Sequence, residues 1–547
     1  MGRGNSLPYF KEENMAYIEP NSTIKLLTNC PLDNTYDHTI YFTSASAQTS
    51  YFESLTKYGY LEYSYVRQNR TLKVQAPVGA NLYDCNYMMF KNNSFENKWF
   101  YAFINHVEYV NNLTWEIQFE LDVMQSWMFD YELEQCFVER EHSATDNLFE
   151  NLVPENLETG EYISDGITRC ADSNSATESL LQDLSLVFAC TFDRQYSDFR
   201  SGYYAGLYSG LCFVDFPLPN PATPANIATF NNTITQWIDG AVNAGKVDGI
   251  LSAFVIPTAF VRSSTSVSTS IGFTKQVSFN DIDGYTPKNK KLFSYPYNFM
   301  YVTNFQGSSV PFMFEYFSNP VSLGIGFRLE ANYAPDMDIV LTPLNYKGVG
   351  LSNYDEKLTL SKFPQLPFSS DVWKAWTAMD MSGSLLGLGA SIAGGAIAGS
   401  VVPGIGNIAG AGVGLAVGSV SIISNLVKTG FQKAIAPPQN HGSTAGSHTL
   451  ASLHLIDFGF MHKHIRAEFA KIIDDYFNMF GYATHECKIP NRNVRPHWTY
   501  TKTVGCCIVG SVPAEDMRKI CNIYNTGITF WRNGNEVGNY SLDNRPV

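Results

Sequence analysis

Charged residues are scarce in this sequence, which also lacks a long basic run and any cysteine spacing typical of metal sites. Only 16% of its 547 residues are charged, and the formal net charge is -14 at pH 7. Nucleic-acid binding through phosphates requires clustered lysine and arginine, so a general nucleic-acid binder is excluded. The ten cysteines include no C-x-x-C pair, which favours reduced, buried thiols over a zinc site or a disulfide framework. The hydrophobic content of 45% excludes intrinsic disorder.

Sequence motifs of the common enzymes are missing as well. No H-E-x-x-H, G-x-S-x-G, Walker A or EF-hand spacing occurs in the chain, so we predict no catalytic residue, no cofactor and no metal site. The first 14 residues are polar and lack the apolar run of a signal peptide. Because a second methionine stands at Met15, residues 1–14 are expected to be an extension outside the fold.

The first 150 residues carry the alternating pattern of antiparallel β-structure. From residue 115 to 123, large apolar side chains alternate with polar or acidic ones, among them Glu116, Glu120 and Asp122. This period of two predicts a strand with one buried face and one anionic, solvated face. Two further strands are predicted at residues 71–75 and 99–110, with the pair Asn111-Asn112 as a tight hairpin.

Helices are expected at three places after an acidic break near residues 150–160. Thr223 followed by Pro224 is typical of a helix N-terminus inside an otherwise β-rich middle region. Ser511 before Pro513 opens a short helix in the tail, and Asn533-Gly534 predicts a final β-hairpin. A longer tail helix, capped by Gly481, is predicted from apolar residues at helical spacing. Its expected core-facing side consists of Ile465, Phe469, Ile472, Tyr476 and Phe480.

Residues 381–427 form a run of 47 uncharged residues that is unlike the rest of the chain. Pro403-Gly404 divides the run into halves that, as helices, would each reach about 27 to 35 Å, near the ~30 Å hydrocarbon thickness of a bilayer. Twelve of the 47 residues are glycine, which makes insertion into a membrane marginal and conditional. The alternative role is a flexible Gly/Ala loop buried inside an oligomer.

We interpret this run as a membrane-active segment. Glycines at every fourth position allow helix backbones to approach closely in a bilayer or in a tight helical cluster. The positions assigned to the activity are Leu385, Leu386, Leu388, Ile392, Gly395, Gly399, Val401, Val402, Ile405, Gly406, Gly410, Gly414, Gly418, Ile422 and Ile423.

Seven of the ten histidines follow this segment. Because histidine changes its charge between pH 5 and 8, acidification would add positive charge beside a segment that has to move. The candidate pH latch consists of His441, His448, His454, His462 and His464. Chance clustering is the alternative. His462 and His464 are expected on the tail helix, where their side chains would point apart, so a metal site is disfavoured.

Several strings resemble one protein family. Residues 97–103 (NKWFYAF), 119–130 (FELDVMQSWMFD) and 137–142 (FVEREH) are similar to the distal tail knob, or tail tube, proteins of small short-tailed phages with protein-primed replication (Picovirinae type). The resemblance covers residues 15–150 and 450–547 well and leaves most of the middle unmatched. It implies a mainly β, multi-domain, tube-forming phage tail protein with an α+β C-terminal part and an inserted Gly/Ala-rich apolar segment.

The resemblance also implies a domain order and a function. The expected parts are an extension (1–14), two parts of a tube domain (15–150 and 436–547), a middle knob domain (151–375) and the apolar segment (376–435). The expected protein is a non-enzymatic virion component at the tail tip, a homo-oligomer and by resemblance a hexamer, attached to an upstream tail collar protein. Its apolar segments would plug the lumen and then form a pore in the host cytoplasmic membrane, through which double-stranded DNA passes without sequence-specific contact.

Within such a tube, Glu116, Glu120 and Asp122 are expected to line the lumen and to let DNA slide without sticking. Three other functions remain open from the sequence. A tail-tip hydrolase of wall polymer would need a pair of carboxylates, which spacing alone does not reveal. A pore-forming toxin would use the same apolar segment, and a purely adhesive, receptor-binding knob would not need it.

Overall fold

The computed structural model describes residues 21–546, except 64–69, 262–269, 332–337, 349–357, 361–364, 367–456 and shorter gaps between 173 and 222 and at 306. Contacts divide the chain into two compact units. The first unit holds residues 1–157, 288–291 and 472–547, and the second holds 158–287 and 292–471. The chain therefore leaves the first unit, returns to it for four residues, and returns again for its last part.

A six-stranded antiparallel sheet forms the N-terminal part of the first unit. Its strand order is β3-β1-β5-β6-β7-β4. The strands are β1 (Ser22–Thr28), β3 (Thr56–Tyr63), β4 (Thr71–Gln75), β5 (Cys85–Lys91), β6 (Phe100–Asn111) and β7 (Thr114–Leu121), and helix α1 (Ala45–Ser54) lies between β1 and β3 in sequence. The strands predicted at residues 71–75, 99–110 and 115–123 are confirmed, and Asn111 pairs with Thr114 across the hairpin.

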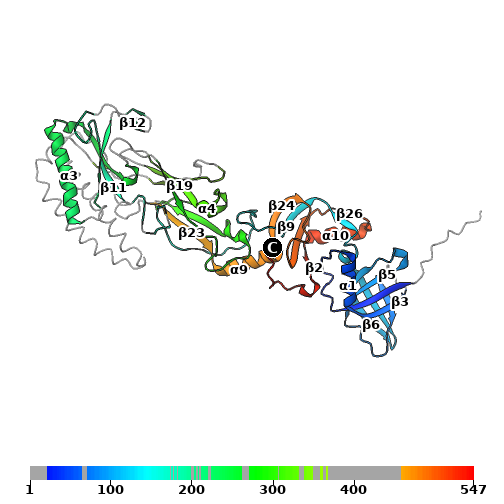
Figure 1. Cartoon of the computed structure of the whole chain (residues 1–547). Coiled ribbons are helices and arrows are strands. Elements are labelled where there is room, and N and C mark those ends of the chain that lie inside the picture. The colour runs from blue at the N-terminus through cyan, green and yellow to red at the C-terminus, as the bar shows by residue number, and fades with distance from the viewer. Residues whose placement is uncertain are drawn as a thin grey trace, which may run out of the picture. The chain divides into compact units, whose positions relative to one another are not determined.

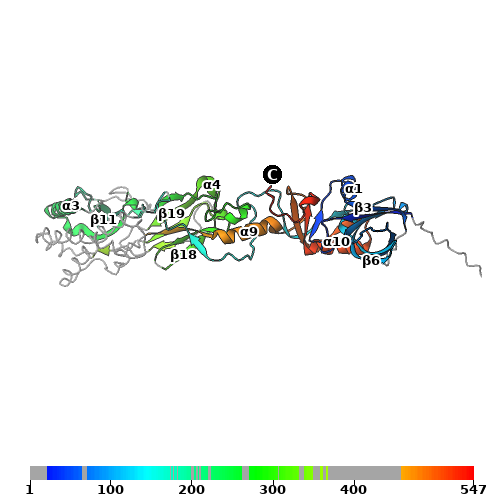
Figure 2. The same cartoon turned by 90° about the horizontal axis from the view of Figure 1, so that it is seen from below.

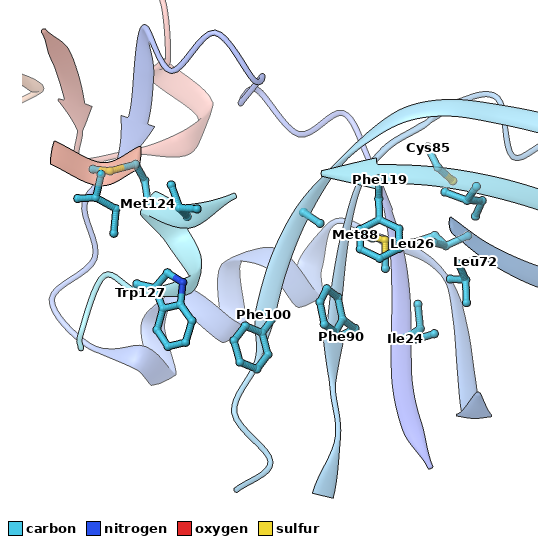
Figure 3. Packing of buried hydrophobic residues seen from close by; sticks show 14 of the residues in the cluster. Ile24, Leu26, Leu72, Cys85, Met88, Phe90, Phe100, Phe119, Met124 and Trp127 are labelled. Atoms are coloured by element: carbon cyan, nitrogen blue, oxygen red, sulfur yellow. The ribbon is translucent and has the colours of Figure 1, made fainter. Parts of the chain in front are cut away.

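Alternation along these strands produces the hydrophobic core shown in Figure 3. Phe119 of β7, Phe90 of β5 and Leu26 of β1 are buried on the same side of the sheet, next to Met124 and Trp127 of the short helix α2 (Val123–Ser126) and the turn after it. Ile520, from the C-terminal part of the chain, is fully buried in the same cluster. Because each buried large apolar side chain contributes about 1.5 to 3 kcal/mol, this shared core holds the two ends of the chain together.

A second sheet of the first unit combines strands from both ends of the chain in the order β2-β27-β25-β9-β24. Its members are β2 (His38–Ile40), β9 (Cys136–Glu141), β24 (Tyr482–Lys488), β25 (Trp498–Val504) and β27 (Ile528–Trp531), and β8 (Tyr131–Leu133) pairs separately with β26 (Ile508–Gly510). Cyan β9 and orange β24 lie side by side in Figure 1 and are paired antiparallel. Helix α10 (Ala514–Thr526) confirms the helix predicted after Ser511.

The C-terminal hairpin predicted at Asn533-Gly534 is wrong. After β27 the chain enters a single 3-10 turn (Gly534–Glu536), and the Asn533 side chain accepts a hydrogen bond from the N–H of Asn535 at 3.1 Å. β27 instead lies between β25, its antiparallel partner, and β2, its parallel partner. Long-range pairing therefore replaces the local hairpin that the dipeptide favours.

The second unit contains three four-stranded sheets, ordered β10-β23-β17-β18, β14-β11-β15-β22 and β16-β19-β20-β21. Their strands are β10 (Tyr162–Ser164), β11 (Leu184–Cys190), β14 (Cys212–Pro217), β15 (Ile250–Pro257), β16 (Ser270–Lys275), β17 (Asn298–Thr303), β18 (Ser309–Phe312), β19 (Ile325–Ala331), β20 (Ile339–Pro343), β21 (Leu358–Leu360), β22 (Gln365–Leu366) and β23 (Gly459–Ile465). The second unit also contains a small pair, β12 (Tyr203–Tyr204) and β13 (Leu207–Tyr208), helix α4 (Pro320–Leu323) and short 3-10 turns at Val247–Gly249, Thr258–Phe260 and Phe314–Tyr316. Two further 3-10 turns lie at Asn93–Phe95, in the first unit, and at Lys290–Phe293, which begins in the first unit and ends in the second.

Helix α3 (Pro224–Asn243) confirms the helix predicted in the middle region. Thr223 caps it by accepting a hydrogen bond from the N–H of Asn226 at 3.2 Å. Its buried side includes Trp237, whose ring lies 5.2 Å from that of Phe188 on β11. Both views show α3 along one side of the sheet that contains β11 (Figures 1 and 2).

The tail helix is present, but its start and its buried side differ from the prediction. Helix α9 spans Ala467–Phe480, and Gly481 caps it with a φ of 64° and an N–H that donates to the Phe477 carbonyl at 2.8 Å. Ile465 lies in strand β23, not in the helix. The buried side of α9 therefore carries Ala470, Ile473 and Phe477, whereas Ile472 is 66% exposed.

Candidate functional site

The outer face of β7 carries Glu116 and Glu120, as the sequence predicts, but cations neutralise it. Glu116 lies 3.4 Å from Lys73, its direct cross-strand neighbour on β4. Glu120 lies 3.3 Å from Lys519 of α10 and 3.9 Å from Arg70. The two carboxylates of the predicted anionic face are therefore paired with cations, because the partner strand and a helix from the other end of the chain supply counter-charges that spacing along β7 does not show.

Asp122 does not belong to this face. Strand β7 ends at Leu121, and Asp122 is only 1% exposed at the N-terminus of α2. Its carboxylate accepts hydrogen bonds from the Gln125 N–H at 3.0 Å and from the Tyr87 hydroxyl at 2.8 Å. Burial raises the pKa of Asp122 to about 6. The expectation that Asp122 lines a lumen is corrected: it is a helix cap inside the core.

A group of buried carboxylates, which the sequence analysis missed, surrounds the segment Lys288–Lys291, called the strap below. Glu155 is in contact with the guanidinium of Arg140 and lies 2.5 Å from the ammonium of Lys291. It also accepts a hydrogen bond from the Ala483 N–H at 3.1 Å. Side-chain exposure is 4% for both Glu155 and Lys291, so the pair depends on direct contact and not on solvent.

Two further carboxylates hold the backbone of the strap. Asp474 of α9 accepts hydrogen bonds from the N–H groups of Lys288 at 2.8 Å and Asn289 at 2.9 Å. Asp146 accepts from the Lys290 N–H at 3.0 Å and from the Tyr482 hydroxyl at 2.8 Å. Burial raises the pKa of Asp146. Together with Glu155, these groups fix the strap to α9, to β24 and to the segment that follows β9.

The second unit places His462 and His464 side by side on β23. Their ring centroids are 5.5 Å apart, and both rings face the carboxylate of Asp165, at 3.5 Å from His462 Nδ1 and 3.2 Å from His464 Nε2. The prediction that they lie on a helix and point apart is wrong, because residues two apart on a strand share one face.

The surroundings of His462 keep its ring neutral over most of the physiological range. Its Nε2 lies 2.6 Å from the side-chain oxygen of Asn298. Burial, reinforced by the neighbouring His464, lowers the pKa of His462 to about 4. Of the five residues of the expected latch, these two are described by the structure, and His441, His448 and His454 lie outside the described residues.

The segment 381–427, with all of its assigned membrane-active positions, also lies outside the described residues. In the part of the chain that is described, no helix has the length and apolar character needed to cross a membrane. Within that same part, no three histidine, cysteine or acidic side chains are arranged to hold a metal ion.

Comparisons with known proteins agree over nearly the whole length. Residues 261–545 match the family model of the C-terminal domain of the tail knob protein gp9 of Bacillus phage phi29, and residues 20–132 match the N-terminus of the caudoviral major tail protein. The tail knob proteins gp9 of Bacillus phages B103 and phi29 are each 25% identical, over 97% of this chain and 100% of theirs. The solved tail knob protein gp12 of bacteriophage C1 has a TM-score of 0.63 at 15% identity, over 96% of this chain and 99% of that one.

Proposed function

Because the chain belongs to the tail knob family represented by gp9 of Bacillus phage phi29, and so is a structural tail component of a virion, we propose that it forms the distal tail tube and passes the genome across the host membrane. The match over 97% of the chain supports this proposal most strongly. A span of that extent includes most of residues 381–427. The family resemblance and the mainly β, multi-domain fold expected from the sequence are confirmed.

The proposed working form is a homo-oligomer, by resemblance a hexamer, that joins an upstream tail collar protein. Light scattering on the purified chain tests the stoichiometry, with six times 61.1 kDa as the expected mass. We infer a non-enzymatic role because the relatives are named as tail knob proteins. Among the described residues, no observation favours the wall hydrolase, the adhesive knob or the toxin over this role.

We propose that DNA passes the outer face of β7. The paired charges at Glu116 and Glu120 support this, because a balanced face neither attracts phosphates strongly nor repels them. Changing both residues to Lys would join them to Lys73 and Lys519 in a basic patch. Ejection from particles carrying Glu116→Lys with Glu120→Lys is expected to slow, most strongly at low salt. Glu486→Lys, on β24, is the matched control, and normal ejection by the double variant would remove support for this lining.

The membrane role is tested by dye release from liposomes of anionic phospholipid at pH 5 and pH 7.5. Full-length protein is compared with a deletion of residues 381–427 whose oligomeric mass is unchanged. Release by the full-length protein alone supports a pore. Stronger release at pH 5 supports the histidine latch without His462, whose pKa of about 4 keeps its ring neutral at that pH. Equal release by both proteins, or by neither, contradicts a membrane-active role for the segment.

A further inference from the structure

Five of the ten cysteines gather in one corner of the first unit. They come from β9, β24, the turn between β25 and β26, and α10: Cys136, Cys487, Cys506, Cys507 and Cys521. The sequence separates them by up to 385 positions, so only the fold brings them together. They serve neither the β7 face nor the strap.

The side chain of Asn525 holds Cys506 beside helix α10, which also carries Cys521. The side-chain oxygen of Asn525 on α10 accepts hydrogen bonds from the N–H of Cys506 at 3.0 Å and from the hydroxyl of Thr503 at 3.0 Å. Cys521 lies four residues before Asn525, on the same face of the helix. The Cys506 side chain interacts with the side chains of both Cys521 and Cys136. Forming a disulfide requires the two sulfurs to approach to the S–S bond length of about 2 Å.

Access to solvent distinguishes this pair from Cys136, and a hydrogen bond to a carboxylate sets Cys507 apart from it. Cys506 and Cys521 are partly exposed, whereas Cys136 is 6% exposed in the strand β9. The exposed thiol of Cys507 donates a hydrogen bond to the Glu134 carboxylate at 3.2 Å. Burial raises the pKa of both Cys506 and Cys521, so exchange through the thiolate is slow at neutral pH and faster in alkali.

We propose that Cys506 and Cys521 are an oxidation site that closes to an intramolecular disulfide once the virion has left the reducing cytosol. The oxidant is a small-molecule disulfide such as cystine. One protein thiolate attacks a cystine sulfur and releases one cysteine; the other protein thiolate attacks the resulting mixed disulfide and releases the second cysteine. The two protons lost by the protein are taken up by the released cysteines. The bond ties α10 to the turn after β25 within the core shared by both ends of the chain.

A matched pair of thiols lies in the second unit. Cys190 on β11 and Cys212 on β14 are directly opposite each other in an antiparallel ladder, and both are buried. The two pairs are alike in being juxtaposed by the fold and differ in their access to solvent. Comparison between them therefore separates oxidation at a solvent-accessible site from oxidation of any adjacent thiols.

The test treats native full-length protein with cystine at pH 8.5, alkylates free thiols, and maps tryptic peptides without reduction. The expected product joins peptide 503–518 to peptide 520–532, at least about tenfold in excess over any product joining Cys190 to Cys212, since buried thiols react slowly. A Cys507→Ser variant is expected to give the same product, because Cys507 shares the first peptide. Oxidation is expected to raise the melting temperature of the wild type but not that of Cys521→Ser or Cys506→Ala.

Particles purified without reductant are expected to contain the same linked peptides. Cys506 that remains fully alkylated in native oxidised protein would overturn the proposal. A bond from Cys506 to Cys136, or loss of the linked peptides in Cys507→Ser, would also overturn it.

Discussion

Carboxylates on the outer face of β7 and carboxylates around the strap belong to the same unit but differ in their surroundings. Glu116 is 25% exposed beside Lys73, whereas Glu155 is 4% exposed between Arg140 and Lys291. Solvent screens the attraction between Glu116 and Lys73. The buried charge of Glu155 is instead compensated by its direct contacts with Arg140 and Lys291. Carboxylate–cation pairs therefore form a charge-balanced surface on β7, where substitutions are expected to cost little stability. Around the strap they fix a chain segment that returns to the first unit.

The largest expected effect follows from breaking the anchor. Glu155→Gln removes the counter-charge of the buried Arg140, which cannot lose its proton, as well as that of Lys291. The variant is expected to destabilise the first unit by about 3 to 5 kcal/mol, since an uncompensated buried charge is costly. Denaturant unfolding measures this as a lower transition midpoint. The double variant Glu155→Gln with Lys291→Met is expected to recover part of the loss. A loss below about 1 kcal/mol in the single variant, the level of an exposed pair, would contradict the anchor.

A smaller effect is expected at Asp122, where the test is the dependence of stability on pH. Its pKa is about 6 in the folded protein against an ordinary value of 3.8. Between these values the folded state binds more protons, so this carboxyl lowers stability as pH rises from about 4 to 6, by about 3 kcal/mol. Asp122→Asn is expected to abolish this pH dependence of the free energy of unfolding. The control variant Asp84→Asn, at an exposed aspartate, is expected to keep it. Parallel curves for wild type and Asp122→Asn would contradict the buried cap.

His462 is expected to produce the opposite slope in the second unit. Its folded pKa of about 4 lies below the ordinary value of 6.5, so the unfolded state binds more protons between these values. Stability is therefore lost as pH falls from about 6.5 to 4, by roughly 3 kcal/mol. Proton NMR titration of the ring and unfolding of His462→Gln measure the effect. A His462 ring that titrates near the ordinary value of 6.5 would contradict this prediction.

The smallest effect is expected at the solvent-accessible pair formed by Glu116 on β7 and Lys73 on β4. Glu116→Gln and Lys73→Gln are each expected to change the free energy of unfolding by less than about 1 kcal/mol, because screened surface pairs contribute little. A double-mutant cycle measures their coupling at low and high salt. Coupling as large as the effect of Glu155→Gln would remove the contrast between the two regions.

Local patterns predicted the parts of the fold that depend on near neighbours. Three such features are the alternation in β7, the cap and proline at the start of α3, and the glycine after α9. Each of them depends only on residues a few positions apart in the sequence. The final hairpin failed because β27 finds its partners in β25 and β2, far away in the sequence. The buried side of α9 was misplaced because Ile465 belongs to the neighbouring strand.

The candidate site was predictable only where a side chain's surroundings are set by its own strand. Glu116 and Glu120 point outward as alternation requires, but their cations come from other elements. Asp122 continues the alternation in the sequence, yet the strand ends one residue before it. The strap carboxylates had no local signal, because Asp146, Glu155 and Asp474 meet residues 288–291 only in the fold.

The most direct test of the central claim measures genome delivery by particles whose tail knob lacks residues 381–427. Wild-type and deletion particles are matched for assembly and for adsorption to cells, and DNA that enters the cytoplasm is quantified after external nuclease treatment. Normal adsorption with loss of DNA entry is the result that we predict. Equal DNA entry by both particles would contradict a membrane-crossing role for the segment and leave the protein as a tube and knob alone.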